Sequence, residues 1–185
     1  PRAHPPIDRV RGCMLGGALG DALGYPVEFL SAERIAKRGA IVSGTSFSDD
    51  TQMTLFVTEG LIRAKQRWND RGLCDPVAVV SRALLRWYAT QTGGDVGDWP
   101  GWLVTERGLH ARRAPGTTCL SSLAALAGGG DAGTVVAPPN HSKGCGAVMR
   151  AAPFGLAMDT RASAFELARD TGVVTHGHPS GYLAG

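Results

Sequence analysis

Two adjacent carboxylates flanked by hydroxyl groups form the first segment with the residue types needed for chemistry. Ser48, Asp49, Asp50 and Thr51 follow one another directly at the expected start of a helix. Carboxylate and hydroxyl oxygens are the ligands that Mg²⁺ and Mn²⁺ prefer in proteins. The same residue types also cap helices, because their oxygens accept hydrogen bonds from the free N–H groups of the first turn. By itself the segment fits either a metal site or plain capping.

A second acidic segment lies nearer the N-terminus. Residues 20–24 read Gly-Asp-Ala-Leu-Gly, and Glu28 follows shortly after them. The glycine spacing differs from that of a dinucleotide-binding loop and no strand precedes it, so a Rossmann fold is not indicated. Asp21 and Glu28 are candidates for acids near a reaction centre. The simpler interpretation is a capped or paired helix carboxylate for Asp21 and a solvated surface acid for Glu28.

A glycine-bearing loop at 140–150 precedes a further predicted helix and reads Asn-His-Ser-Lys-Gly-Cys-Gly-Ala-Val-Met-Arg. Free backbone N–H groups at such a junction can hold a phosphate group, and Lys143 adds a positive charge. The spacing is not that of a Walker A loop, so an ATPase is not indicated. An ordinary connection between a loop and a helix remains the alternative.

Two histidines close to the C-terminus form the last candidate segment, Thr175-His176-Gly177-His178-Pro179. A His-x-His pair can bind a metal, but without further cysteine or histidine ligands nearby it is a weak zinc signal. The alternative is a histidine at the end of a helix that the following glycine and proline terminate.

Apolar residues recur at helical spacing along most of the chain, which predicts an all-α fold. Helices are predicted at about 7–22, 51–65, 118–127, 145–158 and 162–174. A further helix is predicted to begin at Pro76, with Asp75 as its N-cap. Pro153 should kink the helix at 145–158. The segments 93–101, 128–133 and 138–146 are predicted loops that can carry a site. Four glycines recur every four residues along the first helix, at 12, 16, 20 and 24, so we expect a neighbouring helix to approach it closely.

Composition favours one globular domain over residues 1–185. The chain has 185 residues, 43% of them hydrophobic, and a formal net charge of +3 from 19 basic and 16 acidic residues. Because the basic residues form no run, we expect no dedicated nucleic-acid surface and no membrane surface. The four cysteines contain no C-x-x-C pair, which speaks against a zinc ribbon. No signal peptide or membrane-spanning run is evident, so a cytoplasmic protein is expected.

Taken in order, these segments resemble the ADP-ribosylglycohydrolase family, of the type that includes the dinitrogenase reductase-activating glycohydrolase. Residues 20–24 with Glu28 are similar to the family's G-D-x-x-G segment and following acid, and residues 48–51 to its [ST]-D-D-T metal motif. The loop at 140–150 resembles its glycine-rich phosphate loop, and 175–179 its T-H-x-x-P segment. Residues 113–116 and 118–119 are similar to a loop frequent in bacterial members.

The resemblance implies an all-α, orthogonal multi-helix domain with a binuclear Mg²⁺ or Mn²⁺ site. In the family one ligand set comes from the [ST]-D-D segment, here Ser48, Asp49 and Asp50. The other comes from a C-terminal D-x-D-[ST] segment that this sequence lacks. We therefore expect the C-terminal portion of the family domain to be missing, and a face left bare by that loss to favour a dimer or a domain swap.

The implied reaction is hydrolysis of the glycosidic bond of an ADP-ribosylated substrate, with an ADP-ribosyl-arginine protein favoured, and with little or no activity in this chain alone. Glu28, Asp49 and Asp50 are the predicted catalytic acids. The partner would be ADP-ribose or an ADP-ribosylated protein. Asp95 resembles the acid of a family D-I-G segment, although the usual threonine does not follow it. The predicted substrate-binding residues are Asp95, Asn140, Ser142, Lys143, Gly144, Cys145, Gly146, Ala147 and His176.

Three other functions fit the same residues. A non-catalytic ADP-ribose-binding module or pseudoenzyme would bind the nucleotide without turnover. A metal-dependent phosphohydrolase would use the same acids and release phosphate instead of ADP-ribose. A purely structural helical domain would give each segment its simpler interpretation, and the joint occurrence of all the motifs speaks against it.

Overall fold

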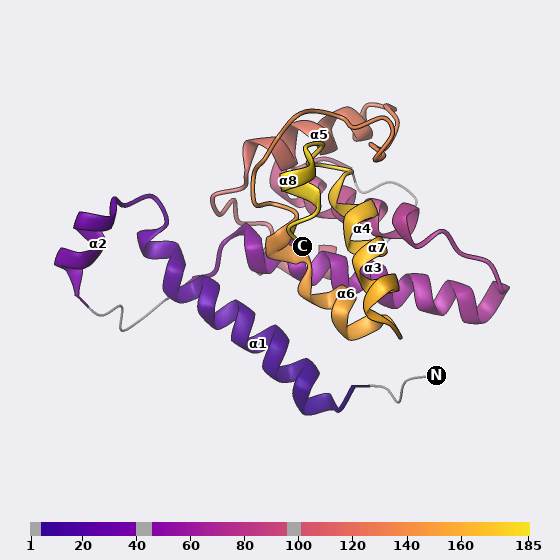
Figure 1. The fold of residues 1–185 in the computed structure, drawn as a ribbon, viewed down its shortest axis with the longest axis horizontal. Coiled ribbons are helices and arrows are strands. Elements are labelled where there is room, and N and C mark those ends of the chain that lie inside the picture. The colour runs from indigo at the N-terminus through magenta and orange to yellow at the C-terminus, as the bar shows by residue number, and fades with distance from the viewer. Residues whose placement is uncertain (1–4, 40–45, 96–100) are drawn as a thin grey trace.

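The computed structural model describes residues 5–39, 46–95 and 101–185. These residues form eight α-helices, four short 3-10 turns and no strand, which confirms the all-α class (Figure 1). Among them no helix combines the length and the apolarity needed to cross a membrane. The helices are α1 (Ile7–Gly24), α2 (Ala32–Arg38), α3 (Asp49–Arg71), α4 (Pro76–Thr92), α5 (Thr117–Ala127), α6 (Ala152–Ala157), α7 (Arg161–Gly172) and α8 (Pro179–Tyr182).

The two long helices α3 and α4 form the centre of the molecule, and α5, α6 and α7 pack around them. Their facing sides bury large apolar side chains, among them Phe56 on α3 and Trp87 on α4. The helices approach most closely at Gly60, where an added Cβ atom would lie 2.9 Å from the Cα atom of Val80. Any larger residue at Gly60 would push the two helices apart, so this glycine sets the distance between them.

The first helix does not have the close neighbour that its glycine stripe led us to expect. No residue of α1 is buried, and a Cβ atom added at Gly12, Gly16, Gly20 or Gly24 would meet no atom within 4 Å. Figure 1 shows α1 and α2 along one edge of the molecule, apart from the remaining helices. For the described residues the expected helix contact along the stripe is therefore wrong, and α1 reaches α3 through Asp21 near its C-terminal end and through Met14 in its middle.

Capping residues account for the helix starts that the sequence predicted. Asp75 accepts a hydrogen bond from the backbone N–H of Ala78 and caps α4. The predicted helix at 145–158 is instead a 3-10 turn (Val148–Arg150) followed by α6, with Pro153 in the first turn of α6. A proline is tolerated there because the first-turn N–H groups have no partner within the helix. Helices α2 and α8 are too short for apolar spacing to predict them.

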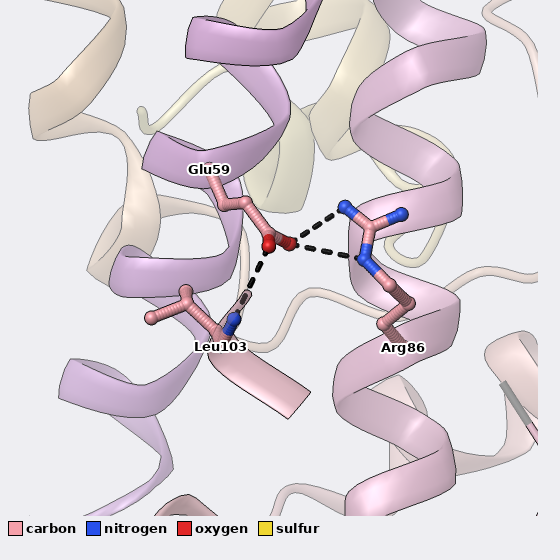
Figure 2. A network of polar contacts seen from close by, with 3 residues as sticks. All are labelled: Glu59, Arg86 and Leu103. Carbon is pink, nitrogen blue, oxygen red and sulfur yellow. Dashed lines mark hydrogen bonds and ion pairs between the residues drawn. The ribbon is translucent and has the colours of Figure 1, made fainter. Parts of the chain in front are cut away.

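A buried ion pair joins α3 to α4 (Figure 2). The side chains of Glu59 and Arg86 are 0% and 3% exposed, and Glu59 Oε2 accepts from Arg86 Nε at 3.0 Å and Nη2 at 2.6 Å. Glu59 Oε1 accepts from the backbone N–H of Leu103 at 3.3 Å. Both carboxylate oxygens are thus satisfied, and the pair also attaches the segment after residue 100 to the core.

Replacing Glu59 by glutamine should destabilise the fold by about 3–5 kcal/mol, because it leaves the Arg86 charge buried without a counter-charge. Urea unfolding monitored by circular dichroism would measure the loss. The double variant Glu59→Leu/Arg86→Met is the control, and it should recover most of the stability since it buries neither charge. A loss below about 0.5 kcal/mol for Glu59→Gln would mean that the pair contributes nothing beyond packing.

Candidate functional site

One carboxylate from α1 caps the N-terminus of α3. The oxygens of Asp21 accept hydrogen bonds from the backbone N–H of Ser48 at 2.9 and 3.0 Å and from the N–H of Thr51 at 3.1 Å. The hydroxyl of Thr51 also donates to Asp21, at 2.5 Å. A negative charge at this position is favourable because the first N–H groups of a helix are unpaired and its dipole is positive there. The structure thus agrees with the interpretation of Asp21 as a helix cap.

The two acids that follow are held by further contacts on either side. Ser48 is buried, and its hydroxyl accepts from the N–H of Asp50 at 3.2 Å. The N–H of Asp49 donates to the carbonyl of Arg113 at 2.9 Å, and Asp49 Oδ2 accepts from the N–H of Gly116 at 3.2 Å. The segment between these two contacts includes Ala114 with a φ of 53°, a left-handed conformation that is strained for alanine. The loop at 113–116 therefore holds Asp49, while Asp21 holds its neighbours Ser48 and Thr51.

A cleft of about 190 Å³ opens beside these acids. It brings together residues from the turn after α1, the start of α3, the start of α5, the glycine-bearing loop and the segment before α8. Its lining is Glu28, Asp49, Asp50, Ala114, Gly116, Thr117, Thr118, Cys119, Gly144, Cys145, Gly146, Met149 and His176. Segments separated by up to about 150 residues in the sequence thus share one small volume.

Seven of the predicted site residues line this cleft: Glu28, Asp49, Asp50, Gly144, Cys145, Gly146 and His176. Six do not: Ser48, Asp95, Asn140, Ser142, Lys143 and Ala147. Ser48 lies directly behind the acids as a cap. Asp95 and Lys143 are exposed, and residues 96 and 97, which complete the segment that Asp95 begins, lie outside the described residues.

Asn140 and Ser142 support the glycine-bearing loop from behind. Asn140 Oδ1 accepts from the N–H groups of Ser142 and Gly177, at 2.9 and 3.0 Å, while its Nδ2 donates to the carbonyl of Thr175 at 2.8 Å. The hydroxyl of Ser142 accepts from the N–H of Gly144 at 3.2 Å and shares a hydrogen bond with Thr118 at 3.1 Å. In this arrangement both side chains shape the loop that faces the cleft.

His176 is buried against the glycines of the same loop. A Cβ atom at Gly146 would lie 2.5 Å from His176 Cε1, so this position has no room for a side chain, and one at Gly144 would make a tight contact of 3.2 Å with Nε2. His176 Nδ1 is 2.9 Å from the hydroxyl of Thr175, which accepts from Arg150 Nη2 at 2.8 Å. Burial, and then the charge of Arg150, lower the pKa of His176 to about 4, so its ring is neutral near pH 7.

Negative charge accumulates on the acidic side of the cleft. Burial raises the pKa of Asp49 to about 7, and the charges of Asp50 and Glu28 add to this against the opposing hydrogen bond from Gly116. The pKa of Asp50 is raised by burial and then by the charge of Asp21. The pKa of Glu28 is raised by burial and by both Asp50 and Asp21. A cation placed among these carboxylates would relieve their mutual repulsion.

The acidic corner of the cleft, formed by Glu28, Asp49 and Asp50, fits a divalent metal only in part. Within the described residues no group of three or more histidine, cysteine, aspartate or glutamate side chains is arranged to hold a metal ion. Asp49 and Asp50 both line the cleft, and their carboxylates suit a hard cation in chemistry and charge. The remaining positions of an octahedral Mg²⁺ would have to be filled by water or by atoms other than these two carboxylates.

Comparison with known proteins identifies the family to which this chain belongs. The family profile described as ADP-ribosylglycohydrolase matches residues 2–185. The chain belongs to the ADP-ribosylglycohydrolase family. It is 29% identical over 138 residues to the ADP-ribosylarginine hydrolase Tri1 of Pseudomonas putida (strain GB-1), which covers 65% of this chain and 35% of that protein.

Two further relatives match at similar identity. A protein of Archaeoglobus fulgidus named only as uncharacterized is 28% identical over 163 residues, with 80% of this chain and 43% of that protein covered. The Tri1 of Serratia proteamaculans (strain 568) is 30% identical over 88 residues, with 44% and 22% covered. The chain thus spans less than half the length of the curated relatives it matches. No solved structure matches it.

The segment at 114–119 is the part of this ADP-ribosylglycohydrolase cleft that sequence reasoning did not place among the site residues. Ala114, Gly116, Thr117, Thr118 and Cys119 all line the cleft, and Met149 joins them from the turn before α6. The signal that could have found them was the resemblance of residues 113–116 and 118–119 to a family loop. Their place in the cleft depends on the contacts of Asp49 with Arg113 and Gly116, which no local pattern predicts.

Asp49→Asn should stabilise the metal-free protein at pH 8 by on the order of 2–4 kcal/mol and leave its stability at pH 4 nearly unchanged. The pKa of Asp49 is raised from 3.8 to about 7 on folding, so the stability that its protonated form contributes is lost as the pH rises through this range. Urea unfolding at both pH values in EDTA would measure the difference. Asp131→Asn, at an exposed acid, is the control and should change neither value. An equal gain at both pH values would contradict the proposed repulsion.

Proposed function

We propose that this chain supplies the N-terminal half of the active site of a metal-dependent ADP-ribosylhydrolase. The observation that carries the proposal is the single cleft shared by Glu28, Asp49 and Asp50 on one side and by Gly144–Gly146 and His176 on the other. A carboxylate corner beside a glycine-bearing loop is the pairing that hydrolysis of a phosphate-bearing sugar needs. Membership of the ADP-ribosylglycohydrolase family supports the same reaction class.

The acidic side would act on the glycosidic bond. Such bonds break through a transition state with positive charge on the sugar, which nearby carboxylates stabilise. Asp49 and Asp50 would hold Mg²⁺ or Mn²⁺, which when bound supplies Lewis acidity and orients sugar hydroxyls. Glu28 is the lining acid outside that pair, so we assign it the position next to the reacting water or sugar. Water adds to the anomeric carbon, and the products are ADP-ribose and the unmodified acceptor.

The opposite side would hold the pyrophosphate. Gly144 and Gly146 line the cleft with backbone atoms, and neutral His176 adds a ring nitrogen beside them. Arg150 is fully buried behind the loop, 3.9 Å from the sulfur of Cys119, which itself borders Gly146. A buried cation there makes the potential of the loop more positive and favours an anion. Binding energy gained at the pyrophosphate would position the bond to be broken.

We favour an arginine-linked substrate because two of the relatives carry the name ADP-ribosylarginine hydrolase. The described residues contain no group of three or more acidic, histidine or cysteine side chains that could hold a metal, so we expect this chain alone to turn over slowly. The same observation favours one alternative, a module that binds ADP-ribose without hydrolysing it.

An assay with the protein in excess over an ADP-ribosyl-arginine peptide, in the presence of Mg²⁺ or Mn²⁺, would test the reaction. We expect mass spectrometry to detect slow release of free ADP-ribose and unmodified arginine. The rate of this release should fall by roughly 100-fold or more in Glu28→Ala. Glu33→Ala on α2 is the matched control, since Glu33 is exposed and outside the cleft.

Two outcomes would contradict the proposal. Release of phosphate or of AMP in place of ADP-ribose would make the protein a phosphohydrolase. Binding of the peptide with no release in any variant would favour the non-catalytic module.

A further inference from the structure

A second cavity, of about 200 Å³, lies in the groove between the C-terminal half of α3 and the N-terminal half of α4. It shares no lining residue with the candidate active-site cleft. Five of its eight lining residues are arginines and one is an aspartate, so its walls are strongly positive. The lining is Arg63, Gln66, Arg67, Asp70 and Arg71 on α3, and Val79, Arg82 and Arg86 on α4.

One of these arginines is a buried and rigidly held donor. Arg86 is 2% exposed, and Glu59 holds its guanidinium through Nε and Nη2. Figure 2 shows the remaining nitrogen of Arg86 turned away from Glu59. Because Glu59 fixes the orientation of the guanidinium, this nitrogen needs little further ordering to donate to a ligand in the groove.

Three other arginines follow one another at helical spacing. Arg63, Arg67 and Arg71 stand four residues apart and therefore project from the same face of α3. Like charges at this spacing repel each other, and no ion pair within the described residues relieves them. The dipole of α3 accounts for a cation in its last turn, such as Arg71, but not for Arg63 near the middle of the helix.

We infer that this arginine groove binds a phosphate group. Guanidinium groups bind phosphate oxygens through paired N–H donors, and a phosphate near pH 7 carries close to two negative charges and several acceptor oxygens. The several guanidinium groups that line the groove match that charge better than they match a single carboxylate. The lining contains no aromatic side chain on which a base could stack, so the groove fits a phosphate or pyrophosphate better than a whole nucleotide.

The groove is also remote from the proposed catalytic cleft. Asp49 and Arg67 are 18 residues apart on one continuous helix, which corresponds to about 27 Å along its axis. A phosphate in the groove would therefore not occupy the pyrophosphate position near Gly146. The inference rests on α3 and α4 alone and stands independently of the proposed function.

Titration with pyrophosphate at constant ionic strength, followed by NMR of the arginine Nε–Hε groups, would locate the binding. We expect saturable shifts for Arg67 and Arg71, and at least a tenfold loss of affinity in the variant Arg67→Gln/Arg71→Gln. Both side chains are exposed, so the variant should keep the fold, which circular dichroism can confirm. Lys65→Gln is the control, because Lys65 is exposed on the same helix but does not line the groove.

A second pair of titrations would distinguish the source of the phosphate. If the ligand is a free anion, inorganic phosphate and pyrophosphate should bind at least as well as a phosphoserine peptide. If it is a phosphorylated side chain, the phosphopeptide should bind at least ten times more tightly than inorganic phosphate. A control peptide carries aspartate in place of phosphoserine. If it binds as tightly as the phosphopeptide, the inference is overturned. It would also be overturned by pyrophosphate binding that the double variant leaves unchanged, or by tighter binding of single-stranded DNA than of either phosphate probe.

Discussion

The capping of α3 by Asp21 is the contact on which the geometry of the cleft depends. A helix start leaves several N–H groups without partners, and here the carboxylate that accepts from two of them comes from a different helix. The cap therefore joins the C-terminal part of α1 to the start of α3, although no residue of α1 is buried. It also sets the direction in which Asp49 and Asp50 leave the first turn. Glu28, seven residues after Asp21, reaches the same cleft because of this attachment.

Two acids on α3 show how differently the fold treats a buried carboxylate. Glu59 is completely satisfied by Arg86 and by the N–H of Leu103, so its charge helps to hold the helices together. Asp49 is almost as buried, but no ion pair to it is found among the described residues, and its pKa is raised to about 7. An uncompensated carboxylate costs stability, and a fold that retains one next to two others is suited to receive a cation. The ion pair is structural in this sense, whereas the acidic corner has the properties of a site.

The sequence predicted correctly those helix starts that are marked by neighbouring capping residues. Asp75 and Pro76 identified the start of α4, and the hydroxyl and acids at 48–50 identified the start of α3, because capping depends on neighbouring residues. The glycine stripe of α1 misled us, since a repeat shows where a neighbour could approach but not whether one does. The close approach occurs at the single Gly60, which no repeat marks. Asn140 is placed by hydrogen bonds to residues more than thirty positions away, and such contacts cannot be read from one segment.

The account depends most directly on the acidic corner and the glycine-bearing loop forming one working cleft. Calorimetric titration with ADP-ribose, with and without Mg²⁺ or Mn²⁺, tests this on the wild-type chain and on Asp21→Ala. We expect binding that the metal strengthens, and at least a tenfold weakening in Asp21→Ala while circular dichroism shows the helices retained. An absence of ADP-ribose binding under both conditions would contradict the account, as would binding that neither the metal nor the loss of the Asp21 cap affects.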